Sequence, residues 1–118
     1  MKKITLKTAN ERAAKRIVSG IIWNAQNDVY KTWSYEKISL VVDGKDYDAI
    51  FHNRPQYVDN LDKHVWFIPG IINSNVIFQP IISEGYELTD ELASLHTGRL
   101  LEMLMTYHYD EFTEIIVK

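Results

Sequence analysis

Hydrophobic and polar positions alternate along the chain in two different periods, which predict two helices and several strands. From Asn10 to Tyr30, apolar residues recur at the three- and four-residue spacing of a helix that buries one face. Thr8 to Glu11 has the spacing of a capping box, with Thr8 as the predicted cap and Asn10 as a rival cap. A second helix is predicted from Thr89 to about Tyr107, because acids follow the hydroxyl cap.

The remaining apolar segments are short and typical of strands. Strands are predicted at residues 4–7 and 112–117, near the two ends of the chain. Residues 37–51 predict a hairpin in which an Asp43-Gly44 turn pairs Val42 with Lys45. Residues 65–68 and 76–82 predict two more strands, with Pro69-Gly70 as a turn signal and Pro80 at an edge or bulge.

The order β-α-β-β-β-β-α-β over residues 1–118 predicts a single α+β domain. We expect an antiparallel or mixed sheet of about five to six strands with two helices covering one side. In the hairpin, the predicted register gives one buried face, which consists of Ile38, Leu40, Val42, Tyr47, Ala49 and Phe51. A chain of 118 residues fits one domain of ordinary size.

Composition narrows the class of protein. The chain has no cysteine, which excludes a disulfide framework, a thiolate nucleophile and a cysteine zinc site, and it fits a reducing cytoplasm. The first residues lack the apolar segment of a secretory signal, and no apolar run approaches the ~20 residues that span a bilayer. We therefore expect a cytoplasmic protein without a membrane segment.

The net charge of −3 is unevenly distributed. Residues 1–20 hold six lysines and arginines against one glutamate, whereas residues 83–118 hold eight acids against two bases. An acidic chain argues against general nucleic-acid binding through counterion release. Either the two ends lie side by side and neutralise each other, or the basic end holds one small anion.

The face of the first helix opposite its apolar stripe carries aromatic and basic residues. Arg12, Arg16, Trp23 and Tyr30 lie there, where only solvent-compatible residues are needed. Tryptophan, tyrosine and arginine supply much of the binding energy in protein interfaces. We therefore expect Trp23 and Tyr30 in an oligomer interface, and Arg16 with Trp23 in contact with a ligand.

The segment from His52 to Tyr57 is the best candidate for a ligand-binding loop. Pro55 holds Arg54 extended, and an arginine side chain matches the geometry of phosphate or carboxylate. Tyr57 can stack on a base, and Asn53 can bind its polar edge. The alternative is an ordinary surface loop in which Arg54 pairs with a nearby aspartate.

Adjacent aromatics in the second strand pair add a candidate stacking surface. Alternation places Trp66 and Phe67 on opposite faces of the sheet, so that one belongs to the core and the other can face a ligand. The alternative is that both are core or interface residues. Asn75 is a further candidate polar contact.

Catalytic and metal-binding signatures are weak. His96 lies on the apolar side of the second helix, and His108 to Glu111 lies where that helix ends and a cationic histidine complements the helix dipole. Residues 59–64 contain two acids and a histidine in a spacing that matches no calcium or zinc pattern. We expect a protein without catalytic residues, cofactor or metal.

In its length, its cysteine-free α+β organisation and its aromatic and arginine content, the chain resembles small phage-encoded counter-defence proteins. Within that group it is similar to the anti-Thoeris-like sponges, which sequester cyclic nucleotide or cyclic ADP-ribose signals. The resemblance implies a homo-oligomeric protein that binds a nucleotide-like molecule without turnover. The ligand contacts proposed from the residues themselves are Arg54, Asn53, Tyr57, Trp66, Phe67, Asn75, Trp23 and Arg16.

Two other classes of protein fit the same sequence. A protein–protein inhibitor or immunity-type protein would act through the acidic segment from Glu84 to Glu114. A virion or assembly component would use the aromatic face of the first helix for self-association only.

Overall fold

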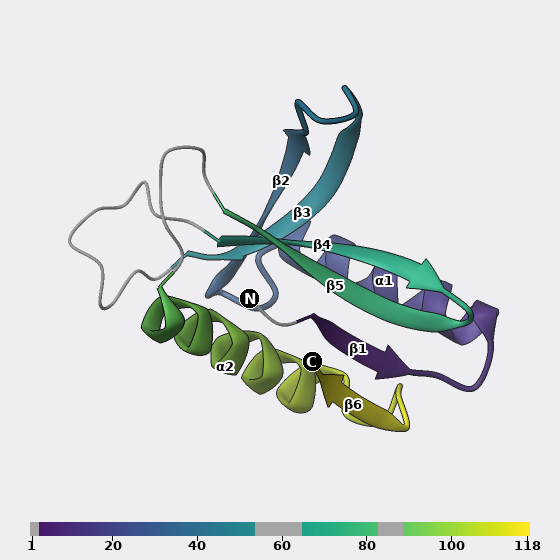
Figure 1. Ribbon diagram of the computed structural model, residues 1–118. Coiled ribbons are helices and arrows are strands. Elements are labelled where there is room, and N and C mark those ends of the chain that lie inside the picture. Colours follow the sequence, from purple (N-terminus) through teal and green to yellow (C-terminus); the bar gives the residue numbers. More distant parts are fainter. Residues whose placement is uncertain (1–2, 54–64, 83–88) are drawn as a thin grey trace.

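The computed structural model describes residues 3–53, 65–82 and 89–118, which form six strands and two helices (Figure 1). The order of the elements confirms the predicted α+β fold. In chain order they are β1 (Ile4–Lys7), α1 (Glu11–Gln26), β2 (Trp33–Ser39), β3 (Asp46–His52), β4 (Val65–Ile72), β5 (Asn75–Ile82), α2 (Asp90–Tyr107) and β6 (Glu114–Val117).

The six strands form one sheet in the order β2-β3-β4-β5-β1-β6, and each neighbouring pair is antiparallel. β1 lies between β5 and β6, so that the two ends of the chain meet in the sheet (Figure 1). Backbone hydrogen bonds between Lys3 and Lys118, at 2.6 and 3.0 Å, close this contact.

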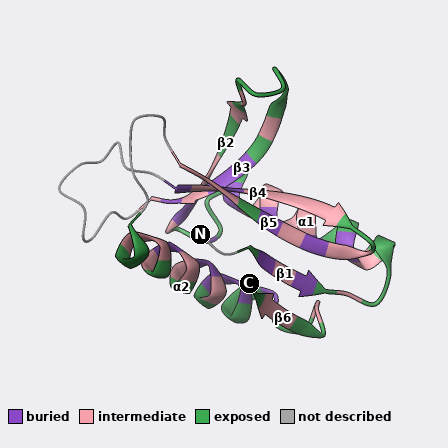
Figure 2. Ribbon diagram, in the orientation of Figure 1, coloured by how far each residue is buried: buried purple, intermediate pink, exposed green. Residues whose placement is uncertain are grey.

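Both helices pack on the same face of the sheet. The strand residues of the hydrophobic core alternate with residues outside it, such as Ile4 and Leu6 in β1 and Val76 and Phe78 in β5 (Figure 2). The helices bury one side each against this face, with Ala14, Ile17, Ile21 and Ala25 from α1 and His96, Leu100, Met103 and Leu104 from α2. We call the opposite side of the sheet the helix-free face.

The first helix is shorter than predicted. It ends at Gln26 rather than Tyr30, and the backbone then turns through left-handed conformations at Asp28 (φ 57°) and Lys31 (φ 65°). Its cap is Asn10, whose side-chain oxygen accepts from the amide of Ala13 at 2.8 Å. The prediction of Thr8 as the cap is wrong.

The first hairpin has a longer loop than the predicted two-residue turn. The amide of Leu40 donates to the carbonyl of Lys45 at 3.0 Å, so that four residues connect the strands and Ile38 pairs with Tyr47. Val42, predicted on the buried face, is 97% exposed. Gly44 adopts a left-handed φ of 66°, which shapes this loop.

The buried face of this hairpin is also the opposite of the predicted one. Trp33 and Tyr35 of β2 pair with His52 and Ile50 of β3, and this set faces the helices. The residues predicted to be buried lie on the helix-free face or in the loop. β2 begins at Trp33, four residues before the predicted strand, and this early start brings the tryptophan into the core.

The second hairpin turns at Asn73 and Ser74, not at Pro69-Gly70. Both turn residues have positive φ, 50° and 66°, as a tight two-residue hairpin turn requires. Pro69 lies within β4, beyond the two residues that pair with β3, and Pro80 lies in β5 beyond the part that pairs with β1. Each proline therefore lies where its strand pairs with only one neighbouring strand. The N–H that proline lacks is not needed for a hydrogen bond to a second strand there.

Candidate functional site

The structure separates the predicted ligand contacts into several places. Arg16 and Trp23 lie on the exposed side of α1, where Trp23 is 59% exposed, and α1 covers the side of the sheet opposite the helix-free face. Asn75 begins β5, opposite Ile72 at the far end of the second hairpin. Arg54 and Tyr57 lie outside the described residues.

Tyr30 does not lie on an exposed helix face, and this prediction is wrong. The side chain is 3% exposed, because the chain has left the helix and turned the ring into the core. Its ring packs edge-on against Tyr107, with centroids 4.8 Å apart, and its hydroxyl accepts from Asn24 at 3.1 Å. Tyr30 is therefore a core residue of this protomer.

The adjacent aromatics of β4 lie on opposite faces, as predicted. Phe67 is fully buried in the core and packs near Trp33 at 6.1 Å between ring centroids. Trp66 lies on the helix-free face, where its ring meets Phe51 edge-on at 6.4 Å. Of the two, Trp66 is the one that is only partly buried and lies outside the core.

Trp66 reaches across the sheet on the helix-free face. Its indole N–H donates to Oε2 of Glu36 at 2.9 Å, although these residues belong to β4 and β2 with β3 between them. Glu36 pairs with Ala49 of β3, and this alanine is fully buried although it faces away from the helices. The contact fixes the orientation of the indole ring.

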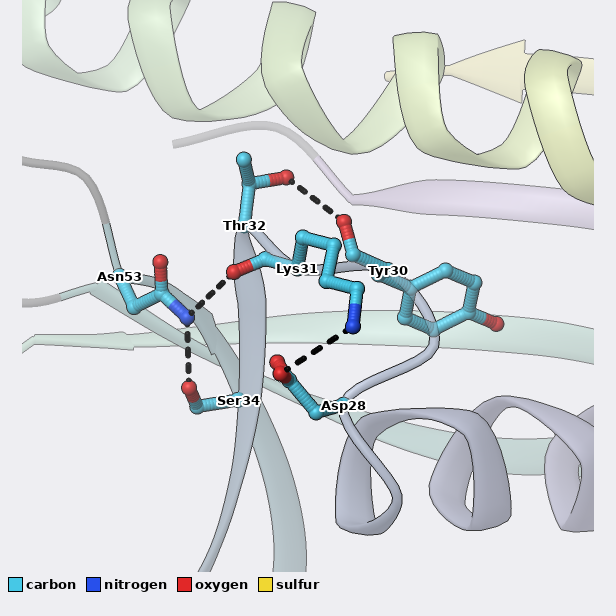
Figure 3. A network of polar contacts seen from close by, with 6 residues as sticks. All are labelled: Asp28, Tyr30, Lys31, Thr32, Ser34 and Asn53. Atoms are coloured by element: carbon cyan, nitrogen blue, oxygen red, sulfur yellow. Dashed lines mark hydrogen bonds and ion pairs between the residues drawn. The ribbon is translucent and has the colours of Figure 1, made fainter.

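Asn53 completes this group at the end of β3. Its side-chain amide donates to Oγ of Ser34 at 2.7 Å and to the carbonyl of Lys31 at 3.2 Å (Figure 3). Its backbone amide donates to the carbonyl of Thr32 at 2.8 Å. We call Ser34, Glu36, Phe51, Asn53 and Trp66 the Trp66 cluster.

The Trp66 cluster combines an aromatic surface with oriented hydrogen-bonding groups. The carboxylate of Glu36 accepts, and the amide of Asn53 uses its N–H groups on the protein, which leaves its carbonyl oxygen as an acceptor. The carbonyl of Lys31 contacts Asn53, whereas its side chain points away from Asn53 and places its ammonium 3.6 Å from the carboxylate of Asp28 (Figure 3). The next residue in sequence after Asn53 is Arg54.

Sequence reasoning predicted Asn53 and Trp66 but missed the other members of the cluster. Phe51 was assigned to a buried hairpin face, and Ser34 and Glu36 were not considered. The pairing of Phe51 with Trp66 depends on the β3–β4 register, for which the sequence carries no local signal.

A second polar network is buried between the helices. The hydroxyl of Tyr30 lies 2.5 Å from Nε2 of His108, and Nδ1 of His108 lies 2.5 Å from Oε2 of Glu111. The side-chain amide of Asn24 donates to the same hydroxyl at 3.1 Å, so that this hydroxyl contacts both Asn24 and His108. Burial raises the pKa of Tyr30 to about 12. With Tyr30 and His108 almost wholly buried, the network holds the ends of the two helices together.

A shallow hollow of about 300 Å³ lies on the outer side of α2, lined by Ser94, Leu95, Gly98, Arg99 and Glu102. The guanidinium of Arg99 lies 3.5 Å from the carboxylate of Glu102 within this hollow. A carboxylate beside the cation makes it a poor site for an anion.

In the described parts of the chain, no group of three or more histidine, aspartate or glutamate residues is arranged to hold a metal ion. Within the same residues, neither helix has the length and apolar character needed to cross a membrane. Comparison of the chain with protein-family models, with curated proteins and with solved structures finds no match.

Proposed function

We propose that this chain is a non-catalytic binding protein that sequesters a nucleotide-like molecule at the Trp66 cluster. The observation that carries the proposal is the contact between Trp66 and Glu36, which fixes an indole ring on the helix-free face beside Phe51. The resemblance to signal-sequestering sponges points to a cyclic nucleotide or a cyclic ADP-ribose type of molecule.

The chemistry of the cluster suits a nucleobase. An aromatic ring that stacks on a base contributes roughly 1–3 kcal/mol. The carboxylate of Glu36 and the carbonyl oxygen of Asn53 are acceptors for the amino group of a purine. Both acceptors are held by hydrogen bonds within the protein, so that little side-chain entropy is lost when a base binds.

The phosphates of such a ligand require cations next to the base. Arg54 follows Asn53 in sequence. An arginine side chain can bind phosphate through two parallel hydrogen bonds. We therefore assign the base to Trp66 and the phosphates to Arg54.

A thermal-shift panel of nucleotides, cyclic nucleotides and ADP-ribose-type molecules tests the proposal. A specific ligand at ~100 times its dissociation constant adds about 2.7 kcal/mol to the free energy of unfolding, which raises the melting temperature. We expect one ligand to give this shift and close analogues to give none.

Three variants locate the site if one ligand gives a shift. Arg54→Ala and Trp66→Ala should abolish the shift while the fold persists. Arg16→Ala is the matched control, because it removes an equal charge from the exposed side of α1 and should leave the shift intact.

A flat panel would contradict the proposal and favour a protein partner at the acidic C-terminal segment. Three of its described acids already have partners within the chain: Glu102 lies 3.5 Å from Arg99, Glu111 lies 2.5 Å from Nδ1 of His108, and Glu114 lies 3.8 Å from Lys7. If Glu102→Lys abolished the biological activity and Arg54→Ala left it intact, the protein would act as an inhibitor of another protein.

A further inference from the structure

The helix-free face is much more apolar than the solvent face of an ordinary antiparallel sheet. Such a sheet with one solvated face alternates apolar residues inside with polar residues outside. Here the outward positions of the paired strands carry Phe51, Trp66 and six isoleucines, none of which belongs to the core or to the residues that pack against it. The isoleucines are Ile38, Ile68, Ile72, Ile77, Ile81 and Ile116.

The charged residues at the strand positions of this face are already paired within the chain. Lys7 and Glu114 are neighbours on β1 and β6, with 3.8 Å between the ammonium and the carboxylate. The third charged residue at these positions is Glu36, which accepts from Trp66. Lys3 and Lys118 lie just beyond them, at the end of the β1–β6 ladder. A second apolar surface could therefore cover the strand positions without burying an unpaired charge, which is the usual obstacle to association.

Gly70 lies among the isoleucines in the middle of β4, opposite Ile77. Its φ is not left-handed, and a Cβ built on it meets no atom closer than the carbonyl oxygen of Ile77, at 4.0 Å. Neither backbone conformation nor crowding within the protomer requires glycine here. A glycine within a strand weakens the strand and often marks a place where another molecule approaches closely.

We propose that a second copy of this chain covers the helix-free face, so that two sheets stack in a two-fold dimer. Stacked sheets align at about 30° because each carries the same twist, and two copies of one chain have identical twist. A two-fold axis places the same patch on both partners, and the pairing of charges within each chain makes this patch compatible with itself.

The area of the face is sufficient for such a dimer. With ~4.8 Å between strands and ~3.3 Å per residue, the paired parts of the sheet cover about 600 Å² per copy. Two copies together bury about 1,200 Å² on this estimate, which reaches the size at which specific interfaces begin. The proposed contact lies on the sheet, whereas the sequence predicts an interface at Trp23 and Tyr30, of which Tyr30 is buried in the core.

This dimer does not depend on the proposed ligand. The Trp66 cluster lies at the end of the covered face, so that the second copy supplies an opposite wall for a molecule stacked on Trp66. Loss of ligand binding and loss of the dimer are nevertheless separate measurements.

The test is the mass of the whole chain in solution, measured by sedimentation equilibrium over a range of concentrations. We expect the wild-type protein to have twice the 13.8 kDa mass of one chain. Ile77→Lys should raise the dissociation constant of the dimer at least tenfold, so that the variant sediments as a monomer. Its circular dichroism should be the same as that of the wild type. Val41→Lys, on the 95% exposed tip of the first hairpin, makes the same chemical change away from the face and should remain a dimer.

Two further variants keep the result decisive if Ile77→Lys fails to fold. Gly70→Val adds a Cβ that meets no atom closer than 4.0 Å in the protomer, so we expect it to fold and to weaken the dimer at least tenfold. Trp23→Lys should leave the dimer intact. A wild-type monomer at all concentrations would overturn the proposal, as would dissociation by Trp23→Lys with no effect of Gly70→Val. Arg54→Ala should stay dimeric whether or not a ligand is found.

Discussion

The hydroxyl of Tyr30 lies 2.5 Å from Nε2 of His108 and joins the segment after α1 to the residue that caps α2. The two residues are 78 positions apart in sequence, and both are almost fully buried. Nδ1 of the same histidine faces Glu111, which precedes β6. One chain of hydrogen bonds therefore connects both helices with the last strand.

Tyr30→Phe should destabilise the protein by about 1–3 kcal/mol. The change removes only the hydroxyl, and it leaves Nε2 of His108 without this hydrogen-bond partner and the amide of Asn24 without its acceptor. Urea denaturation followed by tryptophan fluorescence measures this loss, because Trp33 is buried in the same core.

Tyr35→Phe is the matched control for that experiment. Its hydroxyl donates to Asp48 at 2.5 Å at the exposed end of the first hairpin, where water can replace the bond. We expect a change within about 0.5 kcal/mol. Equal losses in the two variants would mean that the network at Tyr30 adds no more stability than a surface hydrogen bond.

The folded protein should lose stability in alkali through Tyr30. Burial raises the pKa of this tyrosine from 10.0 to about 12, so the folded chain keeps a proton that the unfolded chain releases. Its contribution to stability is complete below pH 10 and is lost as the pH rises through about 12. The melting temperature of Tyr30→Phe should therefore fall less steeply over this range than that of the wild type.

The order of the elements could be predicted because it rests on local periodicity. Alternation and three- to four-residue spacing act over a few residues, so they placed both helices and all six strands in the observed order. The ends of elements were less predictable, because they depend on distant partners. α1 ends early because Tyr30 is drawn into the core by α2.

The turns and the strand register were predicted wrongly for the same reason, because they also depend on residues that are distant in sequence. The Asp43-Gly44 signal gave a two-residue turn, whereas the side chain of Asp43 bonds to Lys45 and Tyr47 and supports a four-residue loop. Pro69 gave a false turn signal, because it lies where β4 has no pairing with β3. The candidate site depends on this register: only the β3–β4 pairing shows that Trp66 lies beside Phe51.

Asn10→Ala should cost about 1 kcal/mol of stability, because the side-chain oxygen of Asn10 satisfies the amide of Ala13 in the first turn of α1. Asn10→Asp keeps an acceptor and adds a charge that the helix dipole favours, so it should retain full stability. Thermal denaturation of the two variants decides the identity of the cap. If Asn10→Ala left the stability unchanged, Thr8 rather than Asn10 would be the cap of α1.

Tyr47→Phe should move the pKa of Asp43 upwards, toward its ordinary value. The hydrogen bond from the Tyr47 hydroxyl, with a further bond from the amide of Lys45, holds the pKa of this carboxyl below that value in the folded hairpin. The stability from this carboxyl is present above its unfolded pKa and is lost as the pH falls through the folded one. An NMR titration of the Asp43 side chain follows the change, and an unchanged midpoint would exclude Tyr47 as its main cause.

Phe67→Ala and Trp66→Ala should affect different properties, although the residues are neighbours in β4. Phe67 is fully buried under the helices, so that its truncation creates a core cavity and should cost about 3–5 kcal/mol. Trp66 lies on the helix-free face, and its truncation removes an accessible ring together with one hydrogen bond to Glu36. We expect a clearly smaller loss of stability for Trp66→Ala than for Phe67→Ala.

Ligand binding should show the reverse order. Trp66→Ala should abolish the thermal shift produced by a nucleotide ligand, while Phe67→Ala, measured at a temperature where it is folded, should retain the shift. Denaturation and ligand titration of both variants separate the two roles. If Phe67→Ala lost the ligand and Trp66→Ala kept it, the binding site would lie beneath the helices, and the assignment of the helix-free face would be wrong.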